Sequence, residues 1–311
     1  MIRLKESVKR LHLGRAEPQD GPGPRPAFLG DDSSIDQTIR NHGAKEILAR
    51  IPRSNTVRDM RFLTCAIAFS CILRLAPFAN AQEPRQFTVN ELVDKNIAAK
   101  GGAEAIQALK AVRVAGRLLV NSDQIELTYV QTKKRPDSVR VEATLQGLTL
   151  VQAYDGSQGW KISPFNGRKD PEKMSTDDIK SLIEDADIAG PLVDWKAKGS
   201  EVEYLGLEDV DGTMAHKLRV KRKNGDTAYV FLDPDHFLEI RIVSQRLEHG
   251  ARIEVETDLG DYAKVGGVFL PFSFEAGRKG STDKQKIIIN KAEANLPVDD
   301  TVFQFPAASS K

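Results

Sequence analysis

The feature that most restricts the fold of this chain is an alternation of apolar and polar residues from about residue 111 almost to the end. In IEVETDL (253–259), the acidic residues hold every second position. A period of two predicts β-strands. Strands are expected at 112–120, 124–130, 138–145, 148–154, 159–163, 201–207, 215–222, 227–233, 237–247, 251–262, 268–274 and 285–294.

Short turn signals separate most of these segments. Asp155-Gly156, Asp211-Gly212, Asn224-Gly225 and His249-Gly250 are dipeptides typical of reversals between antiparallel neighbours. Because helical crossovers do not alternate with the strands, a parallel sheet is not expected. Each strand is apolar on one face, which is typical of a sheet covered on one side, and a twisted sheet of this size must curl.

Three segments have the period of a helix. Residues 88–99 open with TVNE, a capping-box pattern, and 103–110 continues the same apolar face. The third, 175–188, interrupts the strands, with Ser175 as its expected cap. We therefore predict an α+β, mostly antiparallel β fold. It is an open half-barrel of about 11–12 strands with helices covering its concave face.

RFLTCAIAFSCILRLAPFANAQ (61–82) has the features of an export signal. Its apolar core is shorter than the roughly 20 residues that cross a bilayer. A positive flank before it and Ala79-Asn80-Ala81 after it are typical of a secretory signal. We expect a signal peptide at 60–81, cleaved between Ala81 and Gln82, with export to the periplasm. An uncleaved anchor is the alternative, since Arg74 interrupts the apolar run.

The signal lies far from Met1, so translation starting at Met60 is the simplest hypothesis. Residues 1–59 are then an upstream extension or a disordered segment, since they show no sustained period. Cys65 and Cys71, the two cysteines of the chain, lie within the signal, so the mature domain 82–311 would carry no thiol. Apolar residues continue after Cys71, which disfavours a lipoprotein signal.

Composition excludes one broad class of function. The formal net charge is +1, and aromatic residues make up 6% of the chain. A nucleic-acid partner is not expected, because such proteins carry basic patches with exposed aromatic residues.

Candidate catalytic residues are few after residue 82. DPDH (233–236) places a histidine beside two carboxylates, but a metal site needs three or four convergent ligands, so a turn is favoured. His216 and His249 stand elsewhere. No G-x-S-x-G elbow or phosphate-binding loop occurs, and YDGSQGW (154–160) is interpreted as a hairpin turn. We predict no enzymatic activity, no catalytic residue, no metal and no cofactor.

Longer stretches resemble a known family. They are YDGSQGW (154–160), GLEDVDGTMAHKLRV (206–220), NGDTAYVFLDPDHFLEIRI (224–242) and DYAKVGGVFLPFSFE (261–275). With the order of helices and strands, they resemble outer-membrane lipoprotein-sorting carriers, the LolA-like proteins, over residues 87–306. The resemblance implies a half-barrel with a helical lid and an apolar cavity for the acyl chains of lipoproteins or lipids. It also implies an inner-membrane donor and an outer-membrane acceptor as partners.

An acyl chain needs an apolar groove, because burial of its surface drives binding. The candidate lining residues are Leu118, Val120, Leu127, Tyr129, Val141, Leu150, Trp160, Leu182, Ile183 and Trp195. An ordinary dry core would use the same residue types. The predicted function is a non-enzymatic periplasmic lipid or lipoprotein carrier. The alternative is a cell-envelope interaction or stress-sensing module with the same fold and no transported lipid.

Overall fold

The computed structural model describes residues 86–307. Its helices are α2 (Val89–Ala99), α3 (Ala103–Ala108) and α4 (Lys180–Ala186). The strands of the first half are β1 (Ala111–Val120), β2 (Ile125–Lys134), β3 (Ser138–Leu145), β4 (Leu148–Tyr154), β5 (Gly159–Ser163) and β6 (Arg168–Lys173). Those of the second half are β7 (Glu201–Val210), β8 (Thr213–Lys221), β9 (Thr227–Leu232), β10 (Glu239–Glu248), β11 (Ala251–Gly260), β12 (Ala263–Val265), β13 (Val268–Leu270), β14 (Ser273–Arg278) and β15 (Gln285–Ala294).

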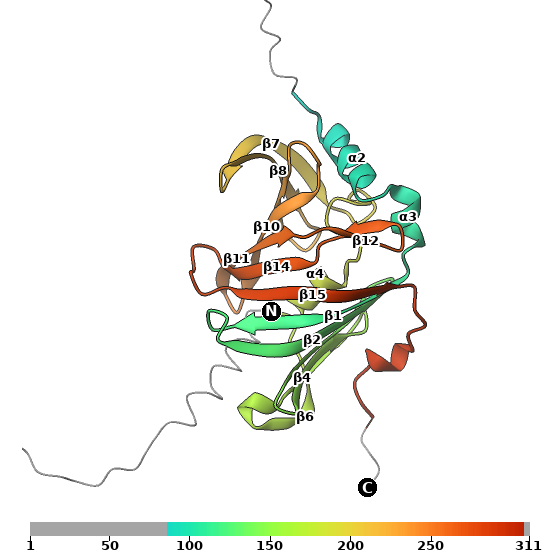
Figure 1. The fold of residues 1–311 in the computed structure, drawn as a ribbon, viewed down its shortest axis with the longest axis vertical. Coiled ribbons are helices and arrows are strands. Elements are labelled where there is room, and N and C mark those ends of the chain that lie inside the picture. The colour runs from blue at the N-terminus through green and yellow to red at the C-terminus, as the bar shows by residue number, and fades with distance from the viewer. Residues whose placement is uncertain (1–85, 308–311) are drawn as a thin grey trace, which may run out of the picture. The chain divides into compact units, whose positions relative to one another are not determined.

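The strands form one 13-stranded sheet in the order β6-β5-β4-β3-β2-β1-β15-β14-β11-β10-β9-β8-β7, and β12 and β13 form a separate hairpin. All neighbouring strands in the large sheet are antiparallel. Within the described part of the chain, β6 and β7 are the two edge strands, so the sheet stays open. Figure 1 shows both ends, at β7–β8 and at β4–β6, running at a steep angle to the central β15 and β1. The predicted open half-barrel is confirmed.

Two strand predictions need correction. The segment 268–274 is not one strand: Pro271 lies between β13 and β14, since proline lacks the amide hydrogen that a sheet requires. RKDPEK (168–173) was not expected to be a strand, yet it forms the edge strand β6. An edge strand tolerates the proline and the charges of this segment, because one of its sides faces no neighbouring strand.

The strand register determines which residues share a face, because directly paired residues point to the same side. One row on the inner face runs through Leu127, Leu118, Ile287, Phe274 and Leu259, and a second runs through Thr257, Ile242, Val230 and Leu218. The inner, concave face is therefore apolar in both halves of the sheet.

The helices cover this inner face. Leu92 and Val93 of α2 pack in a cluster with Leu218 and Val230, while Ile106 of α3 packs in a cluster with Val112. α2 begins as predicted, because Thr88 and Glu91 form a capping box. Burial of these apolar side chains stabilises the fold by about 25 cal/mol per Å² of apolar surface removed from water.

α4 packs through Leu182 and Ala186 against the cluster that contains Leu118 and Leu127. It is shorter than the predicted helix at 175–188. The Ser175 hydroxyl accepts a hydrogen bond from the Asp178 amide, but that contact belongs to turns that precede the helix. After the helix, the Asp187 carboxylate accepts from the amides of Ala189 and Gly190 and reverses the chain.

Candidate functional site

A cavity of about 250 Å³ lies on the inner face, between the two halves of the sheet and the segment 184–191. Its apolar wall is built from five strands and includes Val114, Ile242, Leu259, Phe274, Ile287 and Ile289. These side chains meet because the central strands β1, β15, β14, β11 and β10 are neighbours in the sheet. The wall provides an apolar surface for a hydrocarbon group.

The opposite side of the cavity is polar. Tyr129, Gln131 and Lys133 extend the inward-facing row of β2, and Asp185 reaches the cavity from the last turn of α4. Lys133 and Asp185 are half-buried, and the surface that they retain faces the cavity. The cavity is therefore amphipathic, with hydrocarbon on one side and hydrogen-bonding groups on the other.

Burial shifts the pKa values of these polar groups. Desolvation lowers the pKa of Lys133, although Asp185 and Asp187 oppose the shift. Desolvation also raises the pKa of Asp185, against the attraction of Lys133. The pKa of Tyr129 lies well above its ordinary value because of burial and the nearby Asp185 carboxylate. Each shift disfavours the charged form inside a poorly solvated cavity.

An ion-pair network fixes α4 over the cavity. The Glu184 carboxylate accepts from Arg222 and from Arg246, whose Nη1 lies 3.1 Å from Oε2. Burial disfavours the charge of Arg246, but Glu184 and Glu248 outweigh this and raise its pKa. Both arginine contacts join the helix to the second half of the sheet, through β10 and the end of β8.

A second anchor joins the segment after α4 to α2. Lys100 Nζ donates to the carbonyl of Ala189 at 2.8 Å and to Glu239 Oε1 at 2.9 Å. The Tyr262 hydroxyl donates to the Glu239 carbonyl at 2.7 Å. These contacts restrain α4 and the segment after it, here called the cover, at one end of the cavity.

Of the predicted lining residues, Tyr129 faces the cavity. Six others belong to the neighbouring apolar cluster, which lies between α4 and the sheet: Leu118, Val120, Leu127, Val141, Leu150 and, on α4 itself, Leu182. Trp195 packs beside the α2 cluster in the other half. Ile183 is 42% exposed, because a helix turns by about 100° per residue and Leu182 and Ala186 take the inward positions.

Trp160 is not brought together with the others. It pairs with Ala153 on β4 and packs with Val151 on the outer face of the sheet. Its indole Nε1 donates to the carbonyl of Phe303 at 2.7 Å, so the C-terminal segment covers it.

Sequence reasoning missed the polar side of the cavity. A signal for Lys133 was present, since Ile125, Leu127, Tyr129 and Gln131 alternate toward it along β2. The strand predicted at 124–130 stops short of Lys133, whereas β2 continues to Lys134. Asp185 had no comparable signal, because carboxylates on short helices normally face water.

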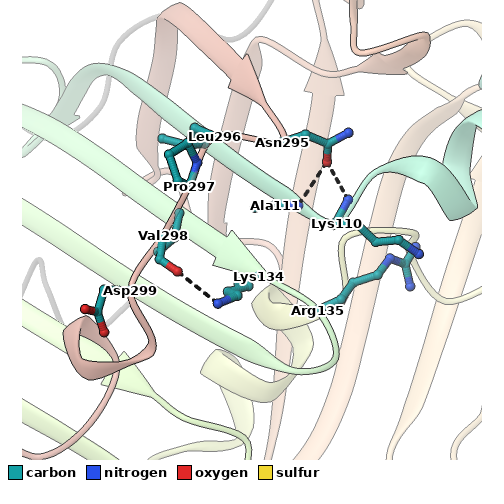
Figure 2. Close-up of a pocket in the computed structure, with 9 residues that line it drawn as sticks. All are labelled: Lys110, Ala111, Lys134, Arg135, Asn295, Leu296, Pro297, Val298 and Asp299. Atoms are coloured by element: carbon teal, nitrogen blue, oxygen red, sulfur yellow. Dashed lines mark hydrogen bonds between the residues drawn. The ribbon is translucent and has the colours of Figure 1, made fainter.

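A second depression, of about 880 Å³, lies between β1, β2 and the C-terminal segment (Figure 2). Its polar groups already have partners. Asn295 Oδ1 accepts from the Lys110 and Ala111 amides, and Lys134 Nζ donates to the Val298 carbonyl at 2.9 Å. These contacts tie the C-terminal segment to β1 and β2, so we read this depression as structural.

The turn interpretations of two motifs are confirmed. In DPDH, Asp233 Oδ1 accepts from the amides of Asp235 and His236. In YDGSQGW, Asp155 Oδ1 accepts from the amides of Ser157 and Gln158. Within residues 86–307, no group of three or more His, Cys, Asp or Glu side chains is placed to hold a metal ion. No helix in that range is long and apolar enough to cross a membrane. The predicted signal peptide lies outside the described residues.

No protein-family model and no curated protein matches this chain. Solved structures align over about 70% of it. They include a DUF1329 family protein from Desulfovibrio piger (12% identity, 98% of that chain covered, TM-score 0.49). A LolA superfamily protein from Nitrosomonas europaea aligns with 13% identity, 98% coverage and a TM-score of 0.48. A putative outer membrane lipoprotein-sorting protein domain from Vibrio parahaemolyticus aligns with 11% identity, 97% coverage and a TM-score of 0.48. The proteins from Nitrosomonas europaea and Vibrio parahaemolyticus carry the name of the family that the sequence resembles.

Proposed function

We propose that this chain is a non-enzymatic carrier of lipids or lipoproteins in the periplasm. The observation that carries the proposal is the cavity of about 250 Å³ on the inner face, whose apolar wall comes from five strands and whose cover is a short helix. Each Å² of hydrocarbon transferred from water to such a wall contributes about 25 cal/mol. Contact with this apolar wall would therefore favour binding of an acyl group.

The cavity is slightly smaller than the roughly 300–1,000 Å³ that is usual for ligand sites. A full acyl chain therefore requires α4 to move away from the sheet. The apolar cluster beneath α4 would then join the cavity, and Leu118, Leu127 and Leu182 would contact the ligand. In this proposal the other predicted lining residues near that cluster, Val120 and Val141, extend the groove.

Export supports the same reading. The segment 60–81 has the pattern of a secretory signal, and a carrier that sorts lipoproteins to the outer membrane must work in the periplasm. Donor and acceptor proteins in the two membranes would be its partners.

An envelope interaction module is the second candidate, and one observation favours it. Leu207 on the edge strand β7 is 53% exposed, and Met214 on β8 is 49% exposed. A free edge with apolar side chains is a surface to which another chain can add. A protein with this role would need no lipid in the cavity.

Native mass spectrometry tests these proposals together. The chain is expressed from Met1 in a bacterium with an outer membrane and isolated from the periplasm. A mass beginning at Gln82 with heterogeneous lipid-sized adducts is the expected result. A clean mass from Gln82 would favour the interaction module, and a full-length product in the membrane would contradict cleavage of the signal.

A further inference from the structure

Four of the polar side chains that line the cavity have a common feature. Tyr129, Gln131, Lys133 and Asp185, here called the polar subsite, make no side-chain hydrogen bond or ion pair with any residue in the part of the chain that the structure describes. Polar groups in a poorly solvated cavity bind best to a ligand that satisfies their hydrogen bonds. The polar subsite therefore points to a ligand that supplies what the protein does not.

The other charged groups around the cavity are already paired. Glu184 is held by two arginines, Lys100 lies 2.9 Å from Glu239, and Asp187 Oδ2 lies 2.6 Å from Lys198. Among the residues that the structure describes, one cation, Lys133, and one anion, Asp185, remain. They are not within ion-pair distance of each other, so a ligand group can stand between them.

The balance of these two charges indicates which headgroup is favoured. A carboxylate would pair with Lys133 but would face the like charge of Asp185. An ammonium group would have the reverse difficulty with Lys133. An uncharged headgroup with both an acceptor and a donor, such as a glycerol ester or an amide, satisfies both side chains without adding a charge to the cavity.

We propose that the cavity selects an uncharged single-chain amphiphile, whose headgroup accepts a hydrogen bond from Lys133 and donates one to Asp185. The hydrocarbon chain lies against the apolar wall at Ile242, Leu259 and Ile287, and Tyr129 and Gln131 provide further hydrogen bonds. The inference rests on the proposed lipid-binding function and adds to it the class of headgroup.

The test compares three probes that each carry a twelve-carbon chain but differ in the charge of the headgroup: monolauroylglycerol, laurate and dodecylamine. Each is titrated at pH 7 and below its micelle concentration into the delipidated full chain, by isothermal titration calorimetry. Monolauroylglycerol is expected to bind about tenfold more tightly than either charged probe, a difference of about 1.4 kcal/mol.

Two variants then reverse the preference. Lys133→Met leaves Asp185 as the unpaired charge, so dodecylamine should become the tightest probe. Asp185→Asn leaves Lys133, so laurate should become the tightest. Both substitutions remove a half-buried charge that forms no ion pair with another described residue, so neither breaks an ion pair within residues 86–307. Lys169→Met and Asp170→Asn, on the exposed face of β6, are matched controls that should keep the wild-type ranking.

The outcomes separate this inference from the proposed function. Binding of all three probes with equal affinity, or a ranking that Lys133→Met and Asp185→Asn leave unchanged, would overturn the headgroup inference and leave a lipid carrier standing. Failure of the wild type to bind any of the probes would contradict the carrier proposal itself, and the inference with it.

Discussion

Lys100, at the C-terminal cap of α2, forms a buried ion pair with Glu239, the first residue of β10, with 2.9 Å between Nζ and Oε1. The two residues are 139 positions apart in the chain. The pair joins the first helix to the second half of the sheet beside the cavity, and Lys100 also holds the Ala189 carbonyl of the cover.

Removing one partner of this pair should destabilise the fold strongly. In Lys100→Met the Glu239 carboxylate stays buried without its cation, and we expect a loss of about 3–5 kcal/mol in the free energy of unfolding. Urea denaturation measures it. The double variant Lys100→Met/Glu239→Leu should recover part of the loss. Glu201→Gln, which breaks an exposed pair with Lys221, should cost at most about 1 kcal/mol.

Loosening the other anchor should make the cover more mobile. Glu184→Gln removes the charge that pairs with Arg222 and Arg246, so α4 is held less firmly. We expect faster amide hydrogen exchange in residues 180–189 than in the wild type, measured by mass spectrometry, and faster uptake of lipid. Glu172→Gln on β6 is the matched control at an exposed pair. Equal exchange in the two variants would show that Glu184 does not hold the helix.

Two neighbouring positions on α4 should respond in opposite ways. Leu182 is buried in the apolar cluster, so Leu182→Ala should cost about 2–5 kcal/mol of stability. Ile183 is exposed, so Ile183→Ala should change stability by no more than about 0.5 kcal/mol. Thermal or urea unfolding distinguishes them. Similar losses in both would mean that the helix is rotated relative to the structure described here.

The raised pKa of Asp185 predicts a pH-dependent difference between the wild type and Asp185→Asn. Because burial raises this pKa in the folded state, the folded protein binds the proton more tightly than the unfolded chain does. The stability that Asp185 contributes is fully present below the ordinary aspartate pKa of about 3.9 and is lost as pH rises through the higher, folded value. Among the described residues, Lys133, Glu184 and Arg246 are charged groups that act on it.

Urea midpoints from pH 4 to pH 8 check this. Asp185→Asn should gain stability relative to the wild type as pH rises. The contributions of the other titrating groups are largely the same in both proteins and cancel in the difference. Asp170→Asn, at an exposed position, should give a flat difference. If the wild type instead became more stable relative to Asp185→Asn as pH rises, the assigned direction of the pKa shift would be wrong.

Much of the architecture was predictable from local patterns. Alternation and turn dipeptides were enough to predict sequential antiparallel strands, since both signals act within a few residues of chain. The capping box at Thr88 was predictable for the same reason. The pairing of β1 with β15 was not predictable, because it joins segments far apart in the chain, and no local pattern indicates that Leu118 aligns with Ile287.

The sequence by itself determined that strands alternate between an apolar and a polar face, that a helical unit precedes them and that a further helix interrupts them once. Tertiary structure decided whether a given side chain lies on the inner or the outer face of the sheet, and which side chains lie together. It turned Trp160 to the outer face and placed α4 so that Asp185 shares a cavity with Lys133. The physical reason is that periodicity reports the surroundings of single residues along one element. A site between two elements depends on how strands far apart in the sequence are paired, and on which helix covers them.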